Sequence, residues 1–280
     1  MNIGKYNKLS VARMVDFGLY LADEDGNEVL LPARYITGVP EVGDEMTVFV
    51  YMDSEGRPVA TTEHPFAEVD QVAFLSVVEV NKVGAFLDWG LQNKNLLCPF
   101  REQKMRMHSG MMYPVYIYLD HASGRVACSA KIEKYIDNLF PRYRRGDKVR
   151  ALVYKRSELG YICVVDNKHS GMIYYSSLYS APEIGETIEA HVAKVRSDGK
   201  IDLVAGGDAV DRTREVGARL LALMEDNGGF VALNDSSSPM AIKEALQCSK
   251  KDFKKAVGNL LKEGKIQIGV DGISLLHLST

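Results

Sequence analysis

The sequence predicts a multidomain, mainly β protein in which three tandem barrels precede a winged helix-turn-helix domain. Two observations carry this prediction. A set of short motifs recurs three times before residue 208, and beyond this residue the spacing of apolar side chains changes from two residues to 3.6. The copies are too long and too complete to be solenoid units. Each copy therefore fits one small all-β barrel.

Glycines mark the repeat most clearly. Gly18, Gly84 and Gly160 each follow the first apolar strand of a copy, with steps of 66 and 76 residues. A second glycine, before the fourth strand, moves by 67 and 75 residues, and a closing basic residue moves by 68 and 75. Because three markers shift nearly in register, we interpret the copies as tandem duplications with an inserted linker before the third.

Strand signals in the first copy are β-branched and aromatic runs bounded by Gly, Asp and Asn. They predict a strand over 11–21 that bends at Gly18, followed by strands over 28–31 and 46–51 and a linker over 61–65. We therefore place the first barrel at residues 1–64.

The next two barrels have similar signals. The second occupies 65–140 and includes a linker helix over 131–140, predicted from apolar residues at helical spacing and ended by Pro141. The third occupies 141–207, and Gly206-Gly207-Asp208 forms a joint after it.

The last segment, 208–280, predicts three helices and a hairpin. The first helix ends at Asn227-Gly228-Gly229, the second begins at Ser238-Pro239, and the third begins at Ser249 with Asp252 three residues on. Asp271-Gly272 between two apolar runs is a strong hairpin signal. This order of elements describes a winged helix.

Charge is distributed unevenly along the 280 residues. The net charge of −3 combines −6 for residues 1–66 (5 basic, 11 acidic), 0 for 67–140, +2 for 141–208 and +1 for 209–280. A polyanion would be attracted to the C-terminal half before the N-terminal half. The overall acidity argues against tight, purely electrostatic binding.

Several function classes lack support in the sequence. No apolar run reaches the roughly 20 residues of a membrane helix, and the N-terminus has no signal-peptide pattern. Four cysteines without paired spacing and six scattered histidines give no disulfide framework or metal site. No catalytic motif is present. We expect a cytoplasmic protein that is not an enzyme and uses no cofactor, metal or membrane.

Binding chemistry remains, carried by aromatic and charged residues at repeated positions. The run Val15-Asp16-Phe17-Gly18 with Tyr20 resembles the S1 RNA-binding domain, which is a five-stranded OB-fold barrel. The resemblance implies that such positions stack bases and bind phosphates. They correspond to Phe17, Tyr20, Asp53 and Arg57 in the first barrel, to Phe86, Asp120 and Arg125 in the second, and to Tyr174 and Lys200 in the third. The alternative for the aromatic residues is burial in the barrel cores.

Two further basic groups are candidates for nucleic-acid contact. The densest positive run is interleaved by Tyr143 and Tyr154, a mixture typical of single-strand sites, and comprises Arg142, Arg144, Arg145, Lys148, Arg150, Lys155 and Arg156. The third helix of the winged helix carries Lys250, Lys251, Lys254 and Lys255, and Lys265 begins the wing. Lysines favour backbone contact over base reading. The alternatives are a solvated linker and a solubilising helix face.

The combination of three barrels and a winged helix, over essentially the whole chain, resembles the conserved virulence factor B family. This resemblance implies a non-enzymatic protein that binds single-stranded RNA with weak sequence selectivity and acts in post-transcriptional regulation. Two alternatives stay open. One is a DNA-binding regulator that contacts duplex nucleic acid through the winged helix, and the other is an adaptor that contacts the ribosome or other proteins.

Overall fold

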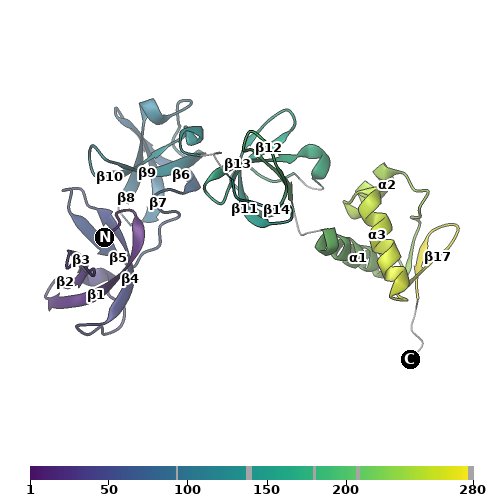
Figure 1. The fold of residues 1–280 in the computed structure, drawn as a ribbon, viewed down its shortest axis with the longest axis horizontal. Coiled ribbons are helices and arrows are strands. Elements are labelled where there is room, and N and C mark those ends of the chain that lie inside the picture. The colour runs from purple at the N-terminus through teal and green to yellow at the C-terminus, as the bar shows by residue number, and fades with distance from the viewer. Residues whose placement is uncertain (93, 137–140, 179–180, 206–208, 277–280) are drawn as a thin grey trace. The chain divides into compact units, whose positions relative to one another are not determined.

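The structure is a computed structural model that describes residues 1–92, 94–136, 141–178, 181–205 and 209–276. The chain divides into two compact units, Met1–Asp137 and Asn138–Thr280. The first unit holds two closed five-stranded barrels, and the second holds a third barrel and a helical domain with a three-stranded sheet (Figure 1). The predicted fold class, three barrels followed by a winged helix, is confirmed.

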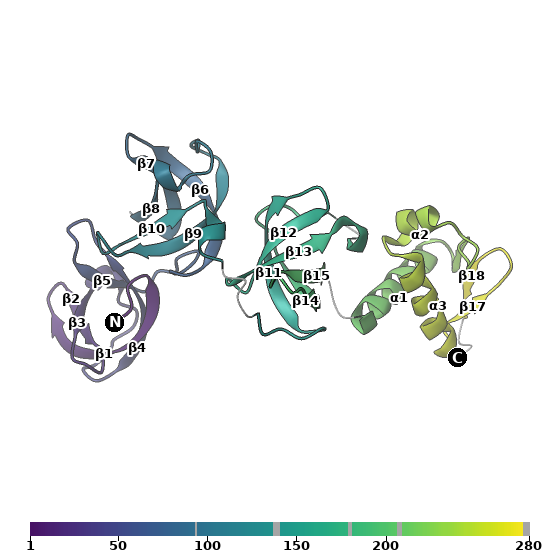
Figure 2. The ribbon, with the colours of Figure 1, turned by 45° about the horizontal axis from the view of Figure 1, so that its top comes forward.

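Barrel one consists of β1 (Lys5–Val15), β2 (Gly18–Ala22), β3 (Glu28–Pro32), β4 (Glu45–Met52) and β5 (Pro58–Thr61). Its strand order is β1-β2-β3-β5-β4, and only β3 and β5 run parallel (Figure 2). The predicted single strand over 11–21 is wrong, because Asp16 and Phe17 form a turn that makes β1 and β2 a hairpin. The bend instead comes from a bulge between Val11 and Arg13.

The other barrels repeat this order. Barrel two contains β6 (Val72–Val80), β7 (Gly84–Leu91), β8 (Lys94–Pro99), β9 (Met112–Asp120) and β10 (Arg125–Ser129). Barrel three contains β11 (Lys148–Arg156), β12 (Gly160–Val165), β13 (His169–Tyr174), β14 (Thr187–Val195) and β15 (Ile201–Ala205). A short 3-10 turn follows the third strand of each barrel: η1 (Ala33–Tyr35), η2 (Phe100–Glu102) and η4 (Tyr175–Ser177).

The repeated glycines have a common structural cause. Gly18, Gly84 and Gly160 each begin the second strand of a barrel, where the backbone passes very close to the third strand. A Cβ atom at these positions would lie 2.1–2.4 Å from a backbone carbonyl oxygen. No side chain fits at such a distance, so the repeat read from the sequence reflects a steric requirement of the barrel.

The hydrophobic core of barrel two extends into barrel one, which also has a separate core of its own. Trp89 is fully buried, and its indole N–H donates to the Ala67 carbonyl at 2.7 Å. The Trp89 ring meets Phe49 of barrel one edge to face, with 5.3 Å between centroids. Tyr51 of β4 belongs to the same core. The two barrels are therefore packed together by large buried aromatic rings.

The predicted helix over 131–140 is wrong in its described part. Only a single 3-10 turn forms, η3 (Ile132–Lys134), and residues 137–140 lie outside the described chain. Tertiary contacts override the helical spacing, since Ile132 is buried and the Tyr135 ring stacks on Tyr116 with 4.3 Å between centroids. The segment packs against barrel two instead of forming an independent helix.

The winged-helix domain consists of α1 (Ala209–Asp226), β16 (Phe230–Val231), α2 (Pro239–Leu246), α3 (Lys250–Lys262), β17 (Ile266–Ile268) and β18 (Ile273–Leu275). Both predicted helix starts are confirmed: the hydroxyls of Ser238 and Ser249 accept backbone N–H bonds at 3.1 Å. Strand β16 was not predicted and adds a third strand to the hairpin.

The joint at 206–208 lies outside the described residues. No helix in the described chain is long and apolar enough to cross a bilayer.

Candidate nucleic-acid interface

Barrel two carries a groove of about 780 Å³ between β7, β8, η2, β9 and β10. Its lining combines aromatic rings with more cations than carboxylates. The rings are Phe86, Phe100 and Tyr118, the cations are Lys94, Arg101 and Arg125, and the one carboxylate is Asp120. Flat aromatic faces beside basic groups are the composition that a single nucleic-acid strand requires.

The cations of this groove carry no ion pair within the described part of the chain. Lys94 Nζ donates to the Met52 carbonyl at 2.6 Å, and Arg125 Nη2 donates to the Ser54 carbonyl at 2.7 Å. Burial, reinforced by the charge of Arg125, lowers the pKa of Lys94. Because these bonds go to neutral carbonyls, the positive charges stay available for phosphate.

Asp120 has a different role from the predicted one. Its carboxylate accepts a 2.7 Å bond from the Ser123 hydroxyl, which is the main reason that its pKa lies below the ordinary value. Arg125 lies opposite Asp120 in the β9–β10 ladder but bonds to Ser54 of barrel one. Asp120 therefore shapes the turn, and Arg125 faces barrel one.

Barrel one exposes Phe17 and part of Tyr20, and most of its cations are paired with carboxylates. Phe17 is 58% exposed and Tyr20 is half-buried, so the alternative of core burial is wrong for both. The Arg13 guanidinium covers the Tyr20 ring at 3.6 Å and pairs with Glu28 at 2.8 Å. This face offers a ring for stacking with little positive charge beside it.

The predicted phosphate-binding pair of barrel one is a closed ion pair. Arg57 bonds to Asp53 at 2.8 Å and to Glu55 at 2.9 Å. The backbone N–H of Arg57, together with its guanidinium, lowers the pKa of Asp53. Two carboxylates thus balance the charge of one cation in this turn.

The predicted residues of barrel three are also paired. The Tyr174 hydroxyl donates to Asp202 at 3.2 Å and contacts Arg196, which forms an ion pair with Asp202 at 2.7 Å. Lys200 pairs with Asp198 at 3.2 Å. The structure therefore brings Tyr174 into a polar network and not beside an unpaired cation.

The dense basic run is spread over barrel three. Arg142, Arg144 and Arg145 precede β11, and Lys148 and Arg150 face outward near its start, while Lys155 and Arg156 end it. Seven strand residues separate Lys148 from Lys155 by about 23 Å. Lys148 pairs with Glu189 at 2.8 Å.

The two tyrosines of this run differ in exposure. Tyr154 is buried, whereas Tyr143 is half-buried and its hydroxyl donates to Asp166 at 3.0 Å. Only Tyr143 therefore keeps part of its ring at the surface beside these basic residues.

The winged-helix lysines divide into two groups. Lys250 donates to the Ser237 carbonyl at 2.9 Å, Lys254 pairs with Asp235 at 3.0 Å, and Lys265 pairs with Glu263 at 2.8 Å. Lys251 and Lys255 are exposed and form no ion pair within the described residues.

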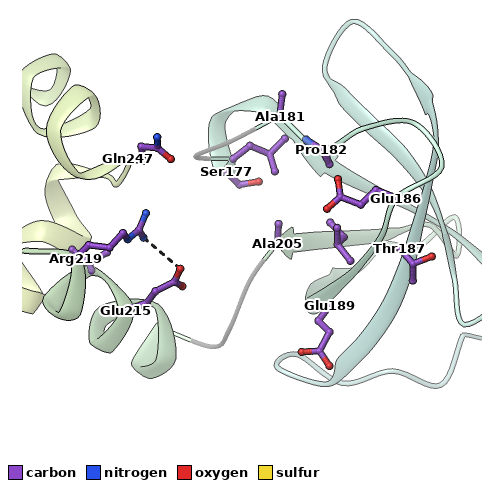
Figure 3. Close-up of a pocket in the computed structure, with 13 residues that line it drawn as sticks. Ser177, Ala181, Pro182, Glu186, Thr187, Glu189, Ala205, Glu215, Arg219 and Gln247 are labelled. Carbon is purple, nitrogen blue, oxygen red and sulfur yellow. Dashed lines mark ion pairs between the residues drawn. The ribbon is translucent and has the colours of Figure 1, made fainter. Parts of the chain in front are cut away.

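The cation of α1 that Figure 3 labels is also paired. Arg219 faces Glu215, with 3.8 Å between Nη2 and Oε1. Its charge is therefore offset within the same helix.

Comparison with known proteins agrees with this arrangement. Residues 3–63 match the family model of the S1 domain, and residues 218–275 match that of the CvfB-like winged helix domain. The uncharacterized protein YitL of Bacillus subtilis is 27% identical over 274 residues, which cover 95% of this chain and 91% of that protein. Conserved virulence factor B of Staphylococcus aureus is 25% identical over 242 residues, which cover 84% of this chain and 80% of that protein. The resemblance to the conserved virulence factor B family is confirmed.

One solved structure is similar to this chain in sequence. A multidomain protein with nucleic acid binding domains from Streptococcus pneumoniae covers 98% of both chains, with 25% identity and a TM-score of 0.42. The matched S1 and winged helix domains support nucleic-acid binding as the class of function.

Four groove residues were missed by the sequence reading: Lys94, Phe100, Arg101 and Tyr118. A signal for Arg101 existed, because Pro-x-Arg follows the third strand in both barrel one (Pro32 to Arg34) and barrel two (Pro99 to Arg101), where it begins a 3-10 turn. Lys94 had no such signal, since its place depends on how barrel one packs against barrel two.

Proposed function

We propose that this protein binds single-stranded RNA through the groove of barrel two, without catalysis, and acts in post-transcriptional regulation in the cytoplasm. The observation that carries the proposal is the groove itself, where Phe86, Phe100 and Tyr118 lie with cations that have no carboxylate partner. The four cysteines are free and buried, which supports a reducing compartment.

The groove favours a single strand over a duplex for a physical reason. Aromatic faces can stack only on bases that are unpaired and splayed out, and each stacked base contributes roughly 1–3 kcal/mol. Any base has such a face, so stacking confers little sequence selectivity. Three cations that each neutralise one phosphate give a shallow salt slope of about −2. We expect affinity in the micromolar range.

The test is a titration of fluorescent oligouridine with matched variants of the two barrels. Arg101→Ala with Arg125→Ala removes two of the three groove cations of barrel two, and Arg34→Ala with Arg57→Ala removes their counterparts in barrel one. We expect the first pair to weaken binding at least about 10-fold and the second to change it less than about 3-fold, because single-strand affinity depends on the phosphates neutralised.

Two results would contradict the proposal. One is an equal effect of the two double variants, and the other is tighter binding of duplex DNA than of oligouridine at the same salt concentration. The second result would favour a DNA-binding regulator that acts through Lys251 and Lys255 of α3.

We further propose that the bases before β11 add phosphate contacts. Arg142, Arg144 and Arg145 are exposed and form no ion pair within the described residues. Changing all three to glutamate is expected to weaken oligouridine binding several-fold. An unchanged titration would show that these residues only solvate the linker.

A further inference from the structure

We propose that barrel one is a positioning element for the binding groove of barrel two, so that the two barrels bind RNA as one rigid body. The positioning group is the turn between β4 and β5, whose backbone carbonyls hold two cations of the groove. This inference rests on the proposed function of the groove. It goes beyond that function because it assigns a role to the barrel in which most cations are paired with carboxylates.

The contact is made by neutral acceptors. The carbonyls of Met52 and Ser54 accept bonds from Lys94 Nζ at 2.6 Å and from Arg125 Nη2 at 2.7 Å. A carboxylate in the same place would cancel the charge of each cation. A carbonyl orients the side chain and leaves its charge uncancelled for phosphate.

The turn that offers these carbonyls is itself held in place. Asp53 Oδ1 accepts the backbone N–H bonds of Glu55 at 2.8 Å and of Arg57 at 2.9 Å. The Asp53–Arg57 ion pair closes the same turn. Asp53 therefore acts as a brace for the carbonyls through its bonds to the backbone of the turn.

Fixing the two long side chains before binding should raise affinity. Lys and Arg side chains lose conformational freedom when a ligand immobilises them, and this loss opposes binding. Because the bonds to barrel one already restrict Lys94 and Arg125 in the folded protein, part of this conformational entropy is lost before RNA binds. Barrel one can supply that benefit only if it stays fixed against barrel two.

The interface between the barrels meets that condition. Beside the shared core around Trp89, the N–H of Val69 donates to the Gly4 carbonyl at 2.9 Å, and Lys5 pairs with Asp70 at 2.7 Å. Gly4 lies so close to barrel two that a Cβ atom would be 2.2 Å from Val69 Cγ2. A side chain at Gly4 would therefore push the barrels apart.

A wedge variant with a matched control tests the inference in the full-length protein. Gly4 and Gly26 have similar left-handed conformations, with φ of +76° and +79°, but a Cβ at Gly26 would meet nothing within 4 Å. The backbone strain of Gly4→Ala and Gly26→Ala is thus comparable, and only the first disturbs the interface. We expect Gly4→Ala to weaken oligouridine binding about 5-fold or more and Gly26→Ala to leave it within 2-fold.

A second variant decides the question if Gly4→Ala fails to fold. Arg125→Lys keeps the charge but replaces the planar guanidinium that bonds to Ser54. We expect it to lose nearly as much affinity as Arg125→Ala, and retention of the parent affinity would overturn the positioning role. If the parent protein does not bind oligouridine, the proposed function fails. If the parent binds and Gly4→Ala matches Gly26→Ala, only the role of barrel one fails.

Discussion

Barrels one and two have the same strand order but differ in how most of their cations are paired. In barrel one, Lys5, Lys8, Arg13 and Arg57 pair with carboxylates, whereas Arg34 lies over the Tyr35 ring and has no ion pair in the described residues. In barrel two, the groove cations bond to carbonyls or to no acidic group in the described chain. Tandem copies can thus keep one fold and differ in function, because the backbone geometry is fixed sterically and the charge pairing is not.

A single inserted residue contributes to this difference. The turn between the last two strands runs from Asp53 to Arg57 in barrel one and from Asp120 to Arg125 in barrel two, which is one residue longer. The longer turn includes Ser123, whose hydroxyl bonds to the Asp120 carboxylate. Arg125 then bonds to a carbonyl of the neighbouring barrel.

The largest expected effect is on stability, and it tests the close glycine contact that both barrels contain. Gly84→Ala forces a Cβ to 2.4 Å from a backbone carbonyl oxygen, and Gly18→Ala to 2.2 Å. We expect each change to destabilise its unit by about 2–3 kcal/mol in chemical denaturation, as overpacking of a close contact does. Gly124→Ala is the control, since its Cβ would meet nothing within 4 Å. If Gly84→Ala cost no more than Gly124→Ala, the steric account of the repeat would be wrong.

The next largest effect compares the contribution of one aromatic ring from each barrel to RNA binding. Phe86→Ala removes a ring from the cationic groove, and Phe17→Ala removes an exposed ring from barrel one. Loss of one stacked base, roughly 1–3 kcal/mol, corresponds to a decrease of about 5- to 150-fold for Phe86→Ala. We expect less than about 3-fold for Phe17→Ala in the same fluorescence titration. The reverse order would move the binding site to barrel one.

The smallest expected effect comes from removing the carboxylate partners of Arg57, which makes the cation pairing of barrel one more like that of barrel two. Asp53→Asn with Glu55→Gln removes both negative charges from Arg57, while the amide oxygen at position 53 can still accept the backbone bonds of the turn. One additional available cation should strengthen oligouridine binding about 3-fold and steepen the salt slope by about 0.7. Titrations at several salt concentrations measure both quantities. An unchanged slope would mean that Arg57 does not reach a bound strand.

The sequence predicted what depends on local pattern. The repeated glycines, the serine caps of α2 and α3 and the Asp271-Gly272 hairpin all appear in the structure because each is a requirement of nearby backbone. The helix over 131–140 failed because burial of Ile132 against barrel two outweighed helical spacing.

The site was harder to predict because it depends on contacts between barrels. Phe86 and Arg125 were found from the repeat, but the residues that surround them in the groove were not. No pattern indicated that Lys94 would meet Met52, since 42 residues separate the two partners. Residue spacing alone also did not show which arginine pairs with a carboxylate. In the structure Arg57 does so, whereas Arg125 bonds to a carbonyl.

Ultraviolet crosslinking of oligouridine to the full-length protein, followed by mass spectrometry of the peptides, tests the central claim most directly. The claim is that the strand lies in the groove of barrel two, so crosslinks should fall on peptides that contain Phe86, Phe100 or Tyr118. Crosslinks confined to Phe17 and Tyr20, or to the second unit, would contradict it.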